Sequence, residues 1–264
     1  MNKQLIKKIM RQLRVLNIAD KIYFYKIKKV YEQDNINFVR NHQDRAVPPE
    51  KMLFEILGNN SFSGYWESGI DDAKWLIDII NNNKPEDELK IAEWGCGLAR
   101  VLRHIKNSHY SCYGYDYCEE YVDWCSTNIA DCSFFKNNFS PPLNVNENTF
   151  DVLYCISVFT HLSERRHSEW AKEILRVLKP GGLFIGTFHG EKHKDKLLGE
   201  GKELFKTGRL IIHDKVLEGS KNYAAYQSSS FLKKTLLEDF ENVKEIDNLP
   251  YHQNVWCATK PLAS

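Results

Sequence analysis

Two glycines at alternate positions follow a short strand-like run within residues 90–105, KIAEWGCGLARVLRHI. A dinucleotide-binding loop needs a third glycine so that the helix after it can pack closely, but that position holds Arg100. The sequence therefore disfavours a nicotinamide dinucleotide. A loop that turns once, at Gly95 and Gly97, suits a bulky ligand without a pyrophosphate group.

Carboxylates stand at the ends of two strand-like runs beside this loop. Glu93 lies two residues before Gly95, and we expect its carboxylate to face the crevice and bind an ammonium group. Asp116 follows Glu93 by 23 residues, close to the spacing of about 20 that is typical of an acid bound to ribose hydroxyls. A carboxylate suits two vicinal hydroxyls because each hydroxyl is a donor. The alternative for Asp116 is an ordinary aspartate in a surface turn.

From about residue 70 onward, helical and strand-like patterns alternate, which predicts a mainly parallel sheet covered by helices on both faces. The predicted strands are 89–94, 110–116, 132–136, 150–159, 182–188 and 254–260. The predicted helices are 69–80, 98–106, 117–129 and 163–178. Residues 188–228 break the alternation and form a predicted insertion, either a functional lid or a plain excursion.

The composition indicates a folded protein with reduced thiols. Hydrophobic residues make up 42% of the 264 residues, which is ample for a core. The seven cysteines are odd in number and form no C-x-x-C pair, so neither a disulfide framework nor a zinc site is indicated. Without a transmembrane run or a signal peptide, we expect a cytoplasmic protein. Its Lys- and Asn-rich usage suggests an AT-rich, bacterial genome.

The N-terminus is strongly basic although the whole chain has a net charge of only +1. Residues 1–30 hold nine Lys or Arg against Asp20 alone, a net +8, so the remaining chain carries −7. Apolar residues recur between the basic ones at helical spacing, which predicts a basic helical cap over residues 1–69 before a main domain of residues 70–264. Three interpretations stay open: a helix packed on the core, a cap that recognises an anionic substrate, or contact with an acidic membrane or nucleic acid.

The glycine loop and its two acids resemble the first motif of class I S-adenosylmethionine (SAM)-dependent methyltransferases, E/D-x-G-x-G-x-G. Ala99 replaces the last glycine, at little cost if that residue is helical. FDVLYCISVFTHL and RVLKPGGLFIGTF resemble later motifs, so the likeness covers residues 88–188. It implies a Rossmann-like, seven-stranded, mainly parallel sheet with an antiparallel last strand beside the fifth. The expected fold is this sheet with the helices predicted on both faces and the N-terminal helical cap.

The resemblance also implies SAM as the cofactor and a set of residues that bind it. Asn137 or Asn138 is expected on the adenine amino group, and Trp66, Ser68 and Gly69 over the methionine end. The full set of predicted cofactor-binding residues is Glu93, Gly95, Cys96, Gly97, Asp116, Tyr117, Asn137, Asn138, Ser157, Trp66, Ser68 and Gly69.

A hydroxyl acceptor needs a base, and histidine has a suitable pKa. His189 and His161 are the candidates because each follows a strand whose end opens on the crevice, although either could instead cap a helix or position a neighbour. His193 lies four residues after His189, but Gly190 weakens a helix there and no carboxylate joins them, so no metal is expected. The candidate acceptor-binding residues are Tyr23, Tyr25, Tyr223, Tyr226 and His213.

Gln253 and Asn254 near the last strand, together with VFTHL, resemble a subgroup that often accompanies polysaccharide synthesis. We therefore predict methyl transfer to a hydroxyl of a small cytosolic acceptor, a sugar or phosphorylated precursor of a cell-surface polysaccharide. The alternatives are an N-methyltransferase of a small phosphorylated amine, a non-catalytic SAM-fold subunit that binds a partner through its basic N-terminus, and a nucleotide-dependent oxidoreductase. A small-molecule substrate is expected and a nucleic-acid partner is not; the sequence predicts no oligomeric state.

Overall fold

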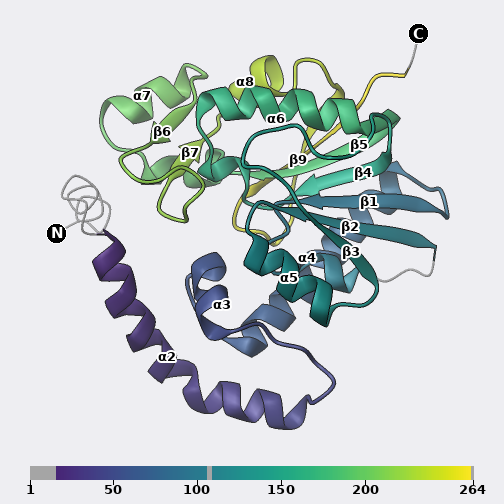
Figure 1. Cartoon of the computed structure of the whole chain (residues 1–264). Coiled ribbons are helices and arrows are strands. Elements are labelled where there is room, and N and C mark those ends of the chain that lie inside the picture. The colour runs from purple at the N-terminus through teal and green to yellow at the C-terminus, as the bar shows by residue number, and fades with distance from the viewer. Residues whose placement is uncertain (1–15, 106–108, 263–264) are drawn as a thin grey trace.

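A seven-stranded sheet in the order β3-β2-β1-β4-β5-β9-β8 forms the centre of the computed structural model, which describes residues 16–105 and 109–262 (Figure 1). Strands β1 to β5 run parallel, and β9 lies antiparallel between β5 and β8. This arrangement confirms the predicted Rossmann-like sheet. The strands are β1 Leu89–Trp94, β2 Tyr110–Asp116, β3 Cys132–Lys136, β4 Phe150–Cys155, β5 Leu178–Phe188, β8 Glu241–Ile246 and β9 Asn254–Thr259.

The central strands are apolar because helices cover both of their faces. On one face, α4, η1 and α5 contribute apolar side chains to a core with β1 and β4, and on the other face α6, α8 and η4 do so (Figure 1). Helices on both faces are therefore confirmed. These elements are α4 Phe62–Asn83, η1 Leu102–His104, α5 Glu119–Asn128, α6 Glu164–Val177, α8 Ser229–Phe231 and η4 Leu232–Leu236, with η2 Phe159–His161 between β4 and α6.

The segment after the glycine loop is not the helix predicted for residues 98–106. Turns lead instead into the single 3-10 turn η1, and residue 106 lies outside the described chain. Ala99 has a left-handed φ of +50°, so the idea that it is already helical is wrong. A left-handed alanine costs about 1–2 kcal/mol relative to a right-handed one. The surrounding loop must hold it there, and Tyr65 donates to the Leu98 carbonyl at 2.7 Å.

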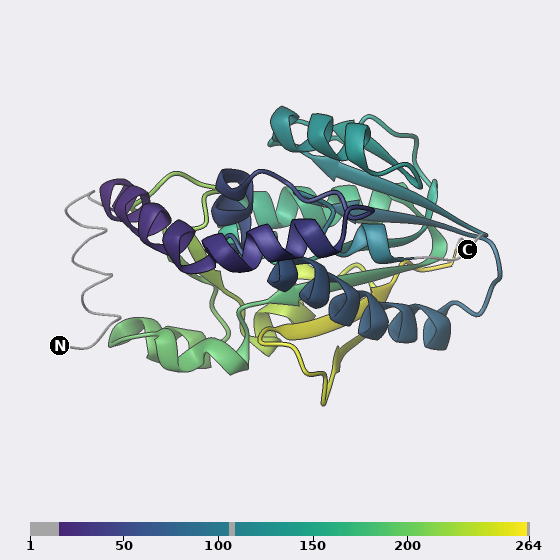
Figure 2. The same ribbon diagram turned by 90° about the horizontal axis from the view of Figure 1, so that it is seen from below.

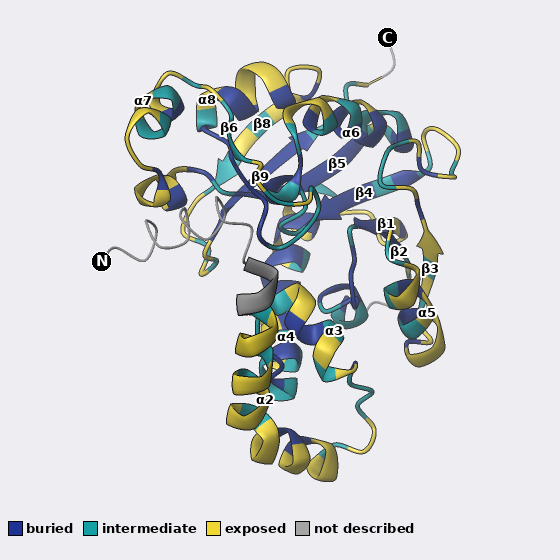
Figure 3. Cartoon of the chain, turned by 60° about the vertical axis from the view of Figure 1, so that its left-hand side comes forward, coloured by how far each residue is buried: buried dark blue, intermediate teal, exposed yellow. Residues whose placement is uncertain are grey.

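An N-terminal helical layer stands beside the sheet domain. It contains α2 (Leu16–Asn41), which lies beside α4, and α3 (Glu50–Leu57) (Figure 2). Asn35 joins α2 to the start of α4, since its amide donates to the Asn60 carbonyl at 2.8 Å and its Oδ1 accepts from Phe62 N–H at 2.9 Å. The outer face of α2 is exposed (Figure 3). The basic residues before residue 16 lie outside the described part of the chain.

The predicted boundary between residues 69 and 70 falls inside α4, and the division into two domains stays a prediction. The insertion holds η3 Glu191–Lys196, α7 Glu200–Lys206 and a two-stranded sheet of β6 Ile211–His213 and β7 Ala224–Tyr226. The β6–β7 loop, residues 214–223, reaches the cap, since Asn222 Nδ2 donates to Asp20 Oδ2 at 2.7 Å. Within residues 16–105 and 109–262, none of the helices is long and apolar enough to cross a membrane.

Candidate active site

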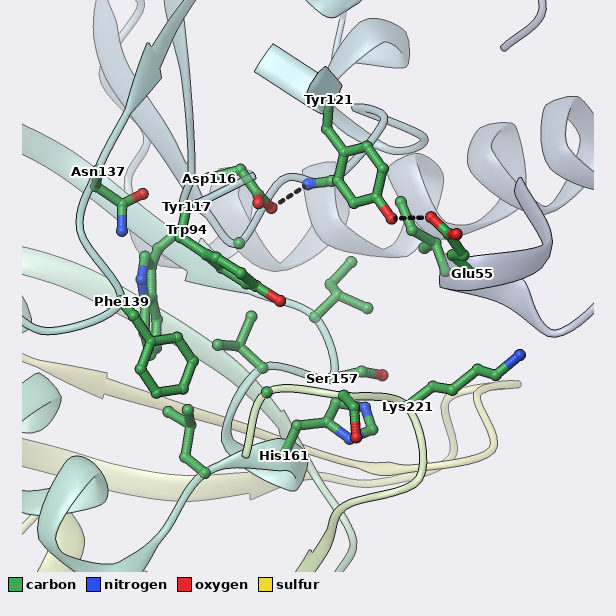
Figure 4. A pocket seen from close by; sticks show the side chains of 18 of the residues that line it. Glu55, Trp94, Asp116, Tyr117, Tyr121, Asn137, Phe139, Ser157, His161 and Lys221 are labelled. Carbon is green, nitrogen blue, oxygen red and sulfur yellow. Dashed lines mark hydrogen bonds between the residues drawn. The ribbon is translucent and has the colours of Figure 1, made fainter. Parts of the chain in front are cut away.

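A cavity of about 410 Å³ opens at the carboxyl ends of β1, β2 and β4. Its floor is the glycine loop and the strand ends, and its walls come from α2, α3 and the β6–β7 loop (Figure 4). Ligands of open α/β sheets bind at this edge. The predicted site residues that line the cavity are Gly95, Gly97, Asp116, Tyr117, Asn137, Ser157 and His161.

The glycine loop is folded tightly against the end of β2. The N–H groups of Gly95 and Cys96 both donate to the Tyr115 carbonyl, at 2.7 and 3.0 Å. Gly95 has φ +73°, and a Cβ atom there would lie 2.3 Å from Val158 Cγ2. Gly97 has φ +52° and a Cβ would meet Ile56 Cδ1 of α3 at 2.8 Å. At Gly95 the left-handed backbone and the contact with the short Val158 side chain together favour glycine, whereas the contact at Gly97 is with the flexible end of Ile56.

Asp116 is oriented by the same loop. Its Oδ2 accepts the Gly97 N–H at 2.8 Å, and its Oδ1 accepts the Cys118 N–H at 2.9 Å. Burial raises the pKa of the Asp116 carboxyl, and the bonds from backbone N–H groups oppose that rise. Each oxygen keeps a second lone pair for a donor in the cavity. Two vicinal ribose hydroxyls fit this arrangement.

Asn137 offers an acceptor of the kind that an adenine amino group requires. Its Nδ2 donates to the Asn138 carbonyl at 2.6 Å, whereas its buried Oδ1 has no partner among the described residues. An unpaired buried carbonyl oxygen costs about 1–3 kcal/mol, which a bound donor would relieve. Phe139 and Trp94 add aromatic walls to the same part of the cavity. The predicted adenosyl cofactor therefore fits, with Asn137 rather than Asn138 facing it, since Asn138 does not line the cavity.

Glu93 does not lie where the sequence analysis expected it. Its carboxylate is buried beneath the loop, only 4% exposed, and accepts a hydrogen bond from the Tyr154 hydroxyl at 2.9 Å. Burial raises the pKa of Glu93 to about 8. Glu93 is not among the residues that line the cavity. Because a strand directs alternate side chains to opposite faces, the residue that ends β1 at the cavity is Trp94.

Further predicted cofactor residues have packing roles instead. Trp66 packs on Arg103, whose Cζ lies 4.2 Å from the centroid of the Trp66 ring. The Ser68 hydroxyl donates to the Gly64 carbonyl within α4. A Cβ at Gly69 would lie 2.1 Å from the Arg100 carbonyl oxygen, so this glycine lets α4 pack on the turn. The Cys96 thiol is also buried away from the cavity.

A closed ring of hydrogen bonds positions Ser157. Its N–H donates to Thr187 Oγ1 at 2.8 Å, the Thr187 hydroxyl donates to Gln253 Oε1 at 2.7 Å, and Gln253 Nε2 donates to Ser157 Oγ at 2.8 Å. Ser157 has a left-handed φ of +62°. The ring joins the ends of β4 and β5 to the start of β9, and it holds an unfavourable backbone conformation at the cavity.

The two candidate bases occupy different places. His161 lines the cavity, and its Nδ1 lies 2.9 Å from the Tyr223 carbonyl oxygen. Because a carbonyl only accepts, Nδ1 carries the proton and Nε2 presents a lone pair. Burial lowers the pKa of His161, so the ring is neutral at pH 7.

His189 lies outside the cavity lining and stacks on His193 with centroids 4.5 Å apart. Burial, with the neighbouring His193 ring second, lowers the pKa of His189 to about 2. The described residues contain no cluster of three His, Cys, Asp or Glu placed to hold a metal ion.

The predicted acceptor-binding residues do not reach the cavity. Tyr25 is 68% exposed on α2, and Tyr23 contacts the Phe54 ring. Tyr226 packs between His189 and His213. Tyr223 is buried and contributes only its carbonyl, which orients His161.

The sequence did not predict the cavity residues that come from the cap, α5 and the β6–β7 loop. They are Asp20, Glu55, Ile56, Tyr121, Gly219, Ser220, Lys221 and Asn222. Asp20 and Asn222 are 202 residues apart in the chain. No local motif marks such residues, because long-range folding alone brings them together.

Comparisons with known proteins agree with this geometry. Residues 92–186 match the family described as "Methyltransferase domain". A relative, the tRNA N(3)-methylcytidine methyltransferase trm140 of Schizosaccharomyces pombe, is 22% identical over 235 residues, which is 82% of this chain and 72% of that protein. This relative overturns the expectation that nucleic acid is not a partner, since a nucleic-acid substrate now stands as a candidate.

Solved structures share the fold. SAM-bound CalS10, an amino pentose methyltransferase from Micromonospora echinaspora, has a TM-score of 0.55 and 13% identity, covering 75% of this chain and 94% of that one. A SAM-dependent methyltransferase from Methanosarcina mazei has a TM-score of 0.51 and 22% identity, covering 70% of this chain and 98% of that one. Residues 92–186 therefore match a methyltransferase domain, and the sheet that contains them has the fold of solved SAM-dependent methyltransferases; both findings support SAM as the cofactor.

Proposed function

We propose that the protein transfers the methyl group of SAM to a hydroxyl oxygen of a small acceptor, with His161 as the base. SAM, when bound, supplies an electrophilic methyl group on its sulfonium sulfur. The protein must hold the acceptor oxygen in line behind that carbon and exclude water. Asp116 and Asn137 would bind the nucleoside, and the cap and the β6–β7 loop would close over it.

The 2.9 Å contact between His161 Nδ1 and the Tyr223 carbonyl oxygen is the observation that carries this proposal. The Tyr223 carbonyl holds the proton on Nδ1, so Nε2 can accept a hydroxyl proton without a prior rearrangement. The low pKa of His161 keeps the ring in its neutral, accepting form at pH 7. A nitrogen nucleophile that binds as a neutral amine needs no such base, so the arrangement favours oxygen.

The enclosure of the cavity supports a small acceptor. Residues from α2, α3 and the β6–β7 loop line its outer side, and the Gly219 N–H of that loop donates to the His161 carbonyl at 2.9 Å. Such covers exclude water from the reaction. A sugar hydroxyl, as in a precursor of a surface polysaccharide, is the acceptor that the sequence resemblance favours.

Nucleic acid is a second candidate acceptor, supported by the tRNA methyltransferase relative. The helix α2 exposes Lys21, Lys26 and Lys29 together with Tyr25. Cations pair with phosphates and aromatic rings stack on bases, so this surface suits a single-stranded segment. Methylation of a ring nitrogen would then require the β6–β7 loop to open.

The test is methyl transfer from SAM that carries a labelled methyl group. Nucleotide-linked and phosphorylated sugars, small amines and unmodified tRNA are offered separately to the purified protein. Label that enters a sugar as an alkali-stable methyl ether supports the proposal. Label that enters only tRNA would overturn it in favour of the second candidate, and label that enters only amines would overturn oxygen as the nucleophile.

A further inference from the structure

The cavity has two chemically different sides. Asp116 and Asn137 lie on the side where β2 and β3 end, and Lys221 lies on the opposite side, beyond Ser157 and His161 (Figure 4). The first side fits a nucleoside, as described above. The opposite side contains an ionic pair that none of the strands contributes: Asp20 from α2 and Lys221 from the β6–β7 loop.

The charged residues that line the cavity indicate which ligand groups this second side can bind. Among the described residues that line the cavity, Lys221 is the sole Lys or Arg, so a carboxylate that enters the cavity has one ammonium partner. The lining carboxylates are Asp20, Glu55 and Asp116. Both oxygens of Asp116 accept backbone N–H groups, and their remaining lone pairs are the ones that suit the ribose hydroxyls.

Glu55 is engaged as well. Its Oε2 accepts from the Tyr121 hydroxyl at 3.0 Å. Glu93, which the sequence analysis expected to bind an ammonium, is buried beneath the floor. Asp20 accepts from Asn222 Nδ2 through Oδ2 at 2.7 Å, which leaves Oδ1 of the carboxylate that pairs with Lys221 to receive an ammonium group.

Contacts with Asp20 and Phe54 position the Lys221 ammonium but leave N–H donors for a ligand. Its Nζ lies 3.7 Å from Asp20 Oδ2, which is an ion pair beyond hydrogen-bond distance, and 3.7 Å from the centroid of the Phe54 ring. Burial lowers the pKa of Lys221, and Asp20 opposes that shift. An ammonium has three donors, so a bound carboxylate could take hydrogen bonds that the described residues do not.

We propose that Lys221 and Asp20 bind the carboxylate and the ammonium of the amino-acid end of SAM. The proposal rests on the proposed function and extends it to residues outside the methyltransferase domain. Each charged group of the ligand then meets an opposite charge at a partly buried site, where charge-assisted hydrogen bonds are strong. The proposal also explains why the cap contacts the β6–β7 loop, since both segments must be in place to bind the amino-acid end of SAM.

A pair of ligands tests the proposal without any acceptor. S-adenosylhomocysteine (SAH) carries the amino-acid end, whereas 5′-methylthioadenosine keeps the nucleoside and a thioether but lacks that end. Both are titrated calorimetrically into the wild-type protein, Lys221→Met and Asp20→Asn. Lys215→Met, an exposed lysine in the same loop, is the matched control.

We expect Lys221→Met to weaken SAH binding about tenfold or more while 5′-methylthioadenosine binding stays within about twofold. Asp20→Asn should show the same ligand dependence, and Lys215→Met should change neither affinity. Equal losses for both ligands would overturn the proposal, because they would show only a disturbed loop. Unchanged SAH binding in Lys221→Met would overturn it too, while wild-type binding of SAH would leave the methyltransferase function intact.

Discussion

The Glu93 carboxylate accepts a 2.9 Å hydrogen bond from the Tyr154 hydroxyl, and both side chains are buried under the glycine loop. Burial raises the pKa of Glu93 to about 8, against about 4.3 in an unfolded chain. Between these values the folded state binds more protons than the unfolded state. The contribution of Glu93 to the free energy of unfolding should therefore fall as the pH rises from about 4.3 to about 8 and level off above.

The variant Glu93→Gln isolates this contribution from the buried histidines, whose lowered pKa values act in the opposite direction at acidic pH. Denaturant unfolding of both proteins is measured at pH 5, 6, 7 and 8. The wild-type protein should lose stability relative to Glu93→Gln along this series. If the difference in free energy of unfolding between the two proteins stays constant with pH, Glu93 is not a buried carboxyl with a raised pKa.

Substitution of two glycines with the same φ angle distinguishes the cost of a steric contact from the cost of backbone strain. Gly95 and Gly58 both have φ +73°, but a Cβ at Gly95 would lie 2.3 Å from Val158 Cγ2, whereas a Cβ at Gly58 would meet nothing within 4 Å. Gly58→Ala should cost about 1 kcal/mol of stability from the left-handed backbone alone. Gly95→Ala should cost a further ~1–3 kcal/mol from overpacking.

Urea unfolding measures both costs, and SAH titration provides a second readout. Gly95→Ala should also weaken SAH binding because Val158 and the loop both line the cavity. Equal stabilities of the two variants would show that the loop shifts freely, which would contradict tight packing of Gly95 against Val158.

The ring of Ser157, Thr187 and Gln253 predicts an order among substitutions at Thr187. This side chain is fully buried and its hydroxyl both accepts from Ser157 N–H and donates to Gln253. Thr187→Val keeps the shape but leaves two buried polar groups unpaired, at about 1–3 kcal/mol each. Thr187→Ser keeps the hydroxyl and loses one methyl group, at about 1 kcal/mol.

Thermal unfolding and SAH titration should both rank the wild-type protein first, Thr187→Ser second and Thr187→Val last. The reverse order of the two variants would mean that the methyl group matters more than the hydrogen-bonded ring.

His161 and His189 should differ sharply in their effect on methyl transfer. His161→Gln should lower the rate by about 10²–10⁴-fold, the usual contribution of a general base, and leave SAH affinity nearly unchanged. His189→Gln, outside the cavity lining, serves as the control and should retain most of the rate. Because the pKa of His161 is lowered, the rate should be flat between pH 7 and 8 and fall only at acidic pH.

The measurement is the single-turnover rate on whichever acceptor the labelled assay identifies. A larger loss in His189→Gln than in His161→Gln would reverse the assignment of the base.

Burial made the central strands predictable, whereas the edge strand β3 was predicted from its two phenylalanines although it is largely accessible. β4 and β5 are continuous apolar runs because helices cover both faces, so their sequence alone is sufficient. β8, with the sequence ENVKEI, lies at the sheet edge and is largely accessible, so it lacked a recognisable pattern. The helix predicted for residues 98–106 does not form there because Ala99, within its first turn, has a left-handed backbone, as do Gly95 and Gly97 before it.

The site was predictable only where it belongs to one local motif. Gly95, Gly97 and Asn137 follow strand ends and Asp116 ends β2, and the topology of a parallel sheet brings strand ends together. Asp20 and Lys221 lie in a helix and a loop whose meeting depends on the packing of the whole chain. Glu93 was misplaced because its spacing is the same whether its side chain faces the cavity or the core.

Calorimetric titration of SAH into the wild-type protein and Asp116→Ala shows whether this cavity binds the adenosyl cofactor. Asp123→Ala, an exposed aspartate of α5, is the matched control. We expect micromolar binding to the wild-type protein and the control, about −8 kcal/mol, and a loss of tenfold or more in Asp116→Ala. A folded wild-type protein that gives no binding heat and no thermal shift with SAH would contradict binding of the adenosyl cofactor in this cavity.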